Sequence, residues 1–527
     1  MSGPTPEDRI LAVAEKILSA IEQPKDHWEV AAHLEVMGIR DLDARQEYGS
    51  RDVFDLARRV LALAGEIPVV ADSRPPRRPL LPWRFLKAYA NGLLFSMPMT
   101  AQIFAMLLLG YSLWGWVGFT LREATAIGLG TIASFVVTGG FAQAISRRGL
   151  FYIHQEEDIL TKRVCYWILF VGILAVAGVG LLFFLINLVF GIFPLDLVGL
   201  AQLYYFLLSA LWLSFSILYM LRRQLLFTGI TLVSLAAVYL VILSPRSDVL
   251  AAHSVGLVTA ILLSCFSGWA ILRRRAKRAR REYTGSELPR ASMLAYATAP
   301  YFWYGALYFA FLFADRIVAW SANAGRGFLP YFIWFDSRYE TGMDWALFSF
   351  VLTVGVLEFT IQEFTERIVP AERVVRADEI GDFNQRFTRF YYTHFALFLA
   401  VAFVSIIGAR LGMSLLREAG VFPLLEDFFT PVAEFVFWWA AAGYVFLVFG
   451  LFNSVFLFAL SRPLFVLRSL IPALLVNVVV GFILSRTVSY EFAVVGLTAG
   501  SLVFLLISGY FARKTFQRLD YYYYSAY

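Results

Sequence analysis

The apolar residues of this chain fall into long runs separated by short polar stretches, from about residue 89 to residue 512. A run of about twenty apolar residues can cross the hydrocarbon core of a bilayer as a helix. The strands of a membrane barrel would instead form shorter segments of alternating polarity, which the sequence does not show. The pattern predicts an all-α polytopic membrane protein with twelve spans, near 89–116, 126–146, 165–193, 197–221, 225–244, 249–272, 293–320, 344–366, 390–413, 431–460, 463–485 and 490–512.

The first 66 residues follow a different pattern, in which apolar side chains recur at helical spacing among charged ones. We expect about three short helices to form a small bundle, the second beginning near Asp26 and one or two more following between Asp41 and Leu63. Residues 73–88 are rich in Pro and Arg and are typical of a linker that approaches a membrane surface. The start of the chain does not resemble a signal peptide, so we expect the first span to direct insertion.

The positions of Lys and Arg predict the orientation. With a cytosolic amino terminus, 23 basic residues fall in the inner loops and tail and seven fall in the outer loops. This asymmetry is typical of cytoplasmic loops, and it predicts that both termini lie in the cytosol and that the protein resides in the cytoplasmic (inner) membrane. The longest basic segment, Arg273 to Arg281, divides the spans into six and six, either as an orienting anchor at anionic lipid or as a site for an anionic partner.

The predicted domains are six. They are a cytosolic helical module (1–72), a basic Pro-rich linker (73–88), a first six-helix bundle (89–272), a basic cytosolic linker (273–292), a second six-helix bundle (293–513) and a cytosolic tail (514–527).

The two bundles have proline and arginine residues at corresponding positions, which is typical of an internal repeat. Pro98 lies in the first span of one bundle and Pro300 in the first span of the other. Arg222 with Arg223, and Arg462, close the fourth span of each. Parallel six-helix repeats are a common plan of transporters.

Composition excludes several classes of function. With 59% apolar and 16% charged residues, the bilayer is the main solvent of this chain. We find no phosphate-binding Gly-rich loop, no serine-hydrolase elbow and no metal-binding His motif, and Cys165 and Cys265 both lie in apolar runs. We therefore expect no catalytic residues, no metal, no cofactor and no nucleic-acid partner.

Ionisable residues at membrane depth are the sharper signals, because an isolated charge is costly in hydrocarbon and tends to face a partner or a cavity. The candidates are Asp315, Arg316, Glu358, Glu363, Glu366 and Glu434. Asp315 and Arg316 are adjacent and cannot share a helix face, so each needs a partner elsewhere, and an Arg of another helix could pair with Asp315. A structural salt bridge and a contact to substrate both explain such residues. Glu358 lies deeper than Glu363, which could be interfacial.

An aromatic and charged stretch lies around the longest predicted outer loop, about residues 321–343. Trp320, Tyr339, Glu340 and Asp344 would suit the face of a sugar, or form an ordinary interfacial belt.

Four further polar residues lie in or near the apolar runs. Asn453 and Asn477 are expected to bond between helices, whereas His253 and His394 lie near span starts, where a solvated or interfacial position is expected.

The segment Tyr304-Gly305-Ala306-Leu307-Tyr308, continued by Asp315-Arg316 and by Tyr339-Glu340-Thr341-Gly342-Met343-Asp344, resembles the multidrug, oligosaccharidyl-lipid and polysaccharide (MOP) exporter superfamily. It is most similar to the membrane subunit of the Pel exopolysaccharide export system, as are Phe456 to Arg462 and Asn477. The resemblance excludes residues 1 to about 80. It implies two bundles around a cavity that opens alternately to either side, and a saccharide cargo.

We therefore expect a non-enzymatic exporter or flippase for a polysaccharide or lipid-linked saccharide, with a cytosolic synthase or regulatory subunit meeting residues 1–72. Two alternatives remain. One is a membrane-embedded polymerase or ligase of cell-envelope glycans, and the other is a non-transporting membrane scaffold.

Overall fold

The computed structural model describes residues 6–20, 24, 26–66, 81–244, 248–279, 288–322, 333–375, 379–418 and 430–525. Over these residues the secondary structure is helical, apart from one isolated bridge between Tyr111 and Trp116. The chain divides into two compact units. One comprises residues 1–88, 358–395 and 513–527, and the other comprises residues 89–357 and 396–512.

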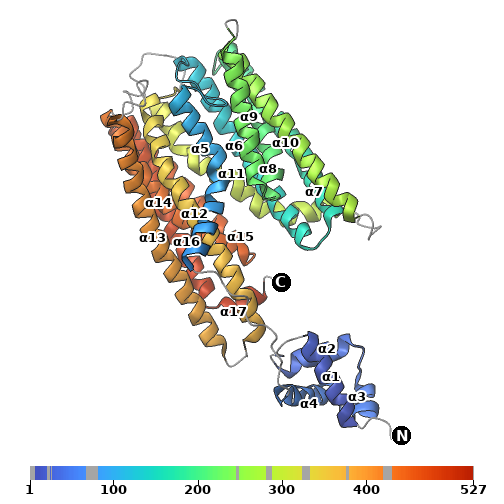
Figure 1. Ribbon diagram of the computed structural model, residues 1–527. Helices are drawn as coiled ribbons and strands as arrows, with labels where there is room; N and C mark the ends of the chain where they lie inside the picture. Colours follow the sequence, from blue (N-terminus) through green and yellow to red (C-terminus); the bar gives the residue numbers. More distant parts are fainter. Residues whose placement is uncertain are drawn as a thin grey trace. The chain divides into compact units, whose positions relative to one another are not determined.

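Four short helices form the amino-terminal module, so two helices follow the second one, where one or two are expected: α1 (Pro6–Ala20), α2 (His27–Val36), α3 (Asp41–Tyr48) and α4 (Val53–Glu66) (Figure 1). Asp26 begins α2 by accepting a hydrogen bond from the Glu29 N–H, and Gly49 ends α3 in the left-handed conformation that glycine favours. The module has its own apolar core, which contains Ile10, Ile17, Val30, Leu34, Leu56 and Val60.

Twelve long helices follow. They are α5 (Leu81–Leu109), α6 (Leu121–His154), α7 (Asp158–Phe190), α8 (Leu195–Met220), α9 (Gln224–Ile242), α10 (Val249–Ala279), α11 (Ala291–Ala322), α12 (Ser337–Val374), α13 (Ile380–Glu418), α14 (Pro431–Ala459), α15 (Pro463–Thr487) and α16 (Ala493–Phe516). Of these twelve helices, as far as the structure describes them, eleven are long and apolar enough to cross a membrane by length and composition, and α5 is the one outside that set. Each predicted span corresponds to one helix in order, so a polytopic helical membrane protein is confirmed.

The two halves contain the same turn at the same place. After α8, Leu221 ends the helix, Arg222 has a φ of 52° and Arg223 begins α9; after α14, Leu460 ends the helix, Ser461 has a φ of 54° and Arg462 begins α15. In each turn the second residue donates its backbone N–H to a carbonyl three residues earlier, and the third donates to a carbonyl five residues earlier. The shared backbone conformation supports the internal repeat suggested by the arginines.

Helix packing shows the same repeat. Gly305 of α11 lies against Gly139 of α6, so closely that a Cβ on Gly305 would be 2.3 Å from the Gly139 carbonyl oxygen. Gly355 of α12 lies against Tyr89 of α5, and a Cβ there would be 3.0 Å from the Tyr89 carbonyl oxygen. The pairs are related by one offset, because 305 minus 89 and 355 minus 139 are both 216. The first helix of each half therefore packs on the second helix of the other, as a two-fold relation between the halves requires.

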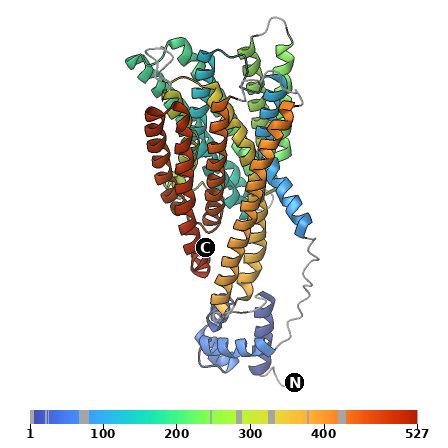
Figure 2. The ribbon, with the colours of Figure 1, turned by 90° about the vertical axis from the view of Figure 1, so that its left-hand side faces the viewer.

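The helices α12 and α13 are longer than a bilayer requires. They contain 38 and 39 residues, whereas about twenty residues span the hydrocarbon. In both ribbon views they run side by side as a hairpin (Figures 1 and 2). The carboxyl-terminal helix α17 (Leu519–Tyr524) packs at the start of α13, where Asn384 and Asp520 exchange two hydrogen bonds of 2.8 and 3.1 Å. The segment predicted as a plain tail thus contains a helix.

Buried polar residues correct one expectation and confirm another. His253 is fully buried and its Nδ1 lies 2.9 Å from the Tyr204 hydroxyl, and His394 is also buried, so the solvated position, one of the two expected for these histidines, is wrong. Asn453 donates to Ser508 of α16 at 3.0 Å, and Asn477 donates to the Phe311 carbonyl of α11 at 2.9 Å. Both asparagines bond between helices, as predicted.

Candidate functional site

A buried carboxyl group on α11 forms the centre of the candidate site. Asp315 is fully buried, and its Oδ2 accepts a 2.7 Å hydrogen bond from the Tyr339 hydroxyl of α12. Its Oδ1 is buried and accepts no hydrogen bond from the part of the chain that the structure describes. The partner of Asp315 is therefore a tyrosine, where an arginine of another helix was one expectation. A carboxyl group with one unused oxygen can take up a proton or a further donor.

Arg316, on the next position of α11, joins the same helix pair through charge. Its Nε lies 2.9 Å from Oε2 of Glu340, and its Nη2 lies 3.7 Å from Oδ1 of Asp344. Glu340 also accepts a 3.0 Å hydrogen bond from the Trp320 indole N–H. Arg316 and Glu340 are nearly buried, whereas the side chain of Asp344 is 60% exposed, so the pair with Glu340 is the stronger one.

The start of α12 is fixed so that these side chains meet. Asp336 is fully buried and accepts a 3.0 Å hydrogen bond from the Tyr339 N–H, which begins the helix. The Trp334 N–H donates to the Trp320 carbonyl at 3.1 Å. Residues from Ser337 onward are helical, so the outer loop predicted over 321–343 is shorter than expected; residues 323–332 of that loop lie outside the described residues.

Aromatic rings join this cluster to the first half. The Arg316 guanidinium lies over the Phe313 ring, with its carbon 5.0 Å from the ring centroid. Phe313 in turn stacks on Phe135 of α6 with ring centroids 5.5 Å apart. Trp320 lies against Gly128 of α6, where a Cβ would be 2.8 Å from the indole ring. A change in the pairing of Arg316 or Trp320 would thus alter the packing of α11 against α6, where the two halves meet.

Trp320, Tyr339, Glu340 and Asp344 lie together as site residues, but their bonding differs from that expected for a sugar-facing surface. Trp320 and Tyr339 are buried, and their polar atoms bond to Glu340 and Asp315. Both rings belong to the main apolar core of the second half. In this conformation their polar atoms therefore form hydrogen bonds within the protein.

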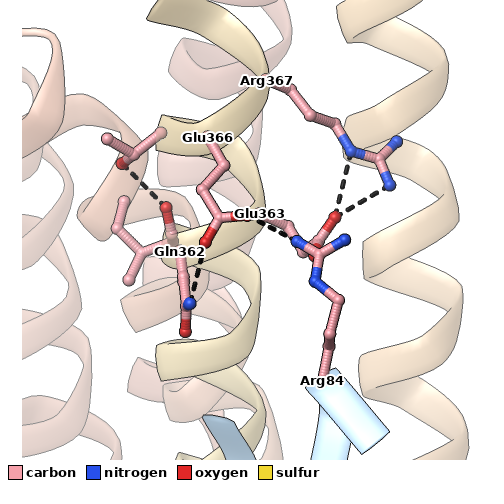
Figure 3. Close-up of polar contacts among 7 residues, drawn as sticks. Arg84, Gln362, Glu363, Glu366 and Arg367 are labelled. Carbon is pink, nitrogen blue, oxygen red and sulfur yellow. Dashed lines mark hydrogen bonds and ion pairs between the residues drawn. The ribbon is translucent and has the colours of Figure 1, made fainter. Parts of the chain in front are cut away.

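A second ionic cluster lies further along α12 (Figure 3). Glu363 is buried; its Oε1 pairs with Arg84 of α5, and its Oε2 lies 2.9 Å from Nη2 of Arg367. Nη2 of Arg84 also lies 2.5 Å from Oε2 of Glu366. The other oxygen of Glu366, Oε1, accepts a 2.8 Å hydrogen bond from the Gln362 side chain. Glu363 is thus a buried residue of an ion network, where an interfacial position was one expectation.

The remaining candidates stand apart from the Asp315 cluster. Glu434 of α14 pairs with Arg410 of α13 at 3.0 Å, and both side chains are partly exposed. Glu358 is half-buried on α12. Sequence reasoning missed Arg84 as a functional candidate, because it lies in a segment predicted as linker. The early start of α5, at Leu81, places it on a helix.

Comparisons with known proteins give a result at the level of structure. No protein-family model and no curated protein matches the chain. Solved structures do match. The inward-facing conformation of a multidrug resistance MATE family transporter of the MOP superfamily aligns with a TM-score of 0.52 at 14% identity, and the alignment covers 83% of this chain and 96% of that chain. An outward-facing conformation of such a transporter gives a TM-score of 0.50 at 14% identity over the same shares. A MATE transporter from Vibrio cholerae gives 0.51 at 14% identity, over 84% of this chain and 98% of that chain. The chain thus has the fold of the MATE transporters of the MOP superfamily.

Proposed function

We propose that this protein is a membrane transporter that works by alternating access. The observation that carries the proposal is the fold, which it shares with transporters solved in inward-facing and outward-facing conformations. The 216-residue offset between equivalent helix contacts adds support, because two related halves can exchange contacts as they rock. The protein resides in the cytoplasmic membrane with both termini in the cytosol, as the distribution of Lys and Arg suggests.

The proposed cargo is a polysaccharide or a lipid-linked saccharide. The support is the resemblance of the segments around Tyr304, Asp315 and Tyr339 to the Pel export subunit. A sugar offers many hydroxyl groups, and the buried carboxylates, guanidinium and aromatic rings of α11 and α12 are suitable partners for them. Because these groups bond to one another here, we propose that they meet cargo only when α11 and α12 rearrange.

Reconstituted vesicles test this function. The purified protein should move a lipid-linked oligosaccharide to the opposite leaflet, and Asp315→Ala should lower the rate while the protein still inserts. Asp158→Asn is a matched control, because Asp158 pairs with Arg275 at 2.8 Å inside the first half. Unchanged transport in Asp315→Ala would remove that residue from the pathway.

The same assay separates the alternatives. Efflux of drug molecules without saccharide movement would refute the proposed cargo and support the transporter function. Elongation of a glycan by the purified protein would instead support the polymerase or ligase alternative.

We further propose that the amino-terminal module docks a cytosolic partner such as a synthase. The module has a core of its own, and its Trp28 ring is 61% exposed and packs edge-on against Phe54 at 5.1 Å. An exposed aromatic pair on a small stable fold is a suitable anchor for another protein. Trp28→Ala should weaken capture of the partner while leaving transport by the isolated protein unchanged.

A further inference from the structure

The ion network around Glu363 is electrically balanced and joins the two halves. Its members are Arg84, Glu363, Glu366 and Arg367, with two charges of each sign (Figure 3). Arg84 belongs to α5, the first long helix of the first half, and the other three belong to α12 in the second half. Only Arg84 among these four crosses between halves, so its bonds are the ones that would break if α5 and α12 separated.

The geometry allows Arg84 to leave without stranding a buried charge. Glu363 has 2% of its side chain exposed, so losing every partner would be costly. However, Arg367 lies one helical turn away and contacts Oε2 of Glu363 through both Nε at 3.1 Å and Nη2 at 2.9 Å. This pair stays within α12 when α5 moves. Arg84, whose side chain is 16% exposed, lies close enough to the surface to be hydrated on release.

Beside the network, an aromatic contact also holds α5 against α12. Phe85 packs edge-on against Phe359 with ring centroids 5.1 Å apart, and Phe359 is 4% exposed. A reagent in water therefore reaches position 359 slowly while Arg84 is bound. Separation of the helices would expose it.

The repeat places a second contact at the equivalent position of the other helix pair. Adding the offset of 216 to 147 gives 363, so Arg147 of α6 corresponds to Glu363 of α12. Arg147 also reaches the opposite half: its guanidinium carbon lies 5.0 Å from the Tyr301 ring centroid of α11, and its Nη2 donates to Ser461 at 3.1 Å. A cation–π contact and a hydrogen bond to a neutral hydroxyl are weaker than a buried ion pair, so Arg84 makes the stronger of the two contacts.

We propose that Arg84 and Glu363 form a reversible ionic latch, which keeps α5 against α12 in one state of the transporter and opens when the halves separate. The latch rests on the proposed transport function. By the predicted topology it lies at the cytosolic ends of both helices. Its design differs from a permanent structural bridge because the acidic residue retains Arg367 in the open state.

A thiol-labelling experiment tests the latch without any cargo. The parent is the full-length protein with Cys165→Ala, Cys265→Ala and the reporter Phe359→Cys, labelled with a charged maleimide. Arg84→Gln should raise the labelling rate at position 359 about tenfold, because it removes charge-assisted bonds from the closed state. Arg84→Lys should give a smaller rise. Asp158→Asn, which breaks an ion pair inside the first half, should leave the rate unchanged.

Two results would overturn the latch. One is parent-like labelling in Arg84→Gln when its melting curve shows a folded protein, and the other is an equal rise in Asp158→Asn. Failure of the transport proposal is separate: faster labelling in Arg84→Gln with no saccharide movement by the parent would keep the latch and refute the cargo.

Discussion

Removing the charge of Arg316 should destabilise the second half more than removing any partly exposed charge. Arg316→Gln leaves Glu340 in place, and among the described residues the Trp320 N–H is then its hydrogen-bond donor. The side chains of Arg316 and Glu340 are 8% and 13% exposed, so water can hydrate the stranded carboxylate only poorly. The expected result is a large loss of stability from one substitution.

The magnitude follows from burial. Breaking a buried ion pair by removing one partner costs about 3–5 kcal/mol. The contact with Asp344 adds little, because that carboxylate lies 3.7 Å away and is largely exposed. As a control, Arg410→Gln breaks the pair with Glu434, whose side chains are 34% and 54% exposed, and should cost less than about 1 kcal/mol.

Thermal unfolding of the purified protein, followed by helical circular dichroism, measures the difference. Arg316→Gln should melt well below the parent, and Arg410→Gln close to it. The double variant Arg316→Gln with Glu340→Gln should recover much of the loss, because no unpaired charge is then buried. Equal melting of Arg316→Gln and Arg410→Gln would refute the assignment of a strong buried pair.

Two further predictions concern packing and pH. Gly305→Ala should destabilise the protein by about 1–3 kcal/mol, because a Cβ would collide with the Gly139 backbone, whereas Gly199→Ala, with open space around its Cβ, should not; melting curves of both variants decide this. In the amino-terminal module, hydrogen bonds from the Arg40 N–H and side chain lower the pKa of Asp43. This stabilisation is present above the ordinary pKa of Asp, about 3.9, and is lost as the pH falls through the lower folded value. The hydrogen-exchange protection of α3, which is its exchange rate corrected for the intrinsic effect of pH on amide exchange, should therefore fall below about pH 4 and lose that pH response in Asp43→Asn.

The order and number of the long helices could be predicted from the sequence. The length of an apolar run decides whether it can cross a bilayer, and this is a local property. The repeat was visible as matched prolines and arginines, and the structure confirms it in the turns at Arg222 and Ser461. The sequence pattern did not predict the early start of α5 or the extra turns of α10, α12 and α13. Charged residues at a helix end resemble a loop in sequence when the residues that pair with them are unknown.

The identity of each polar partner depended on tertiary structure. Arg84 and Glu366 lie 282 positions apart, and no local pattern joins them. Asp315 bonds to Tyr339, whereas charge alone suggested an arginine of another helix as its partner. His253 lies near the start of a span and is nevertheless fully buried. Sequence determined which segments leave water, because hydrophobicity acts residue by residue; packing decided which charges and hydroxyls meet, because that depends on how distant helices cross.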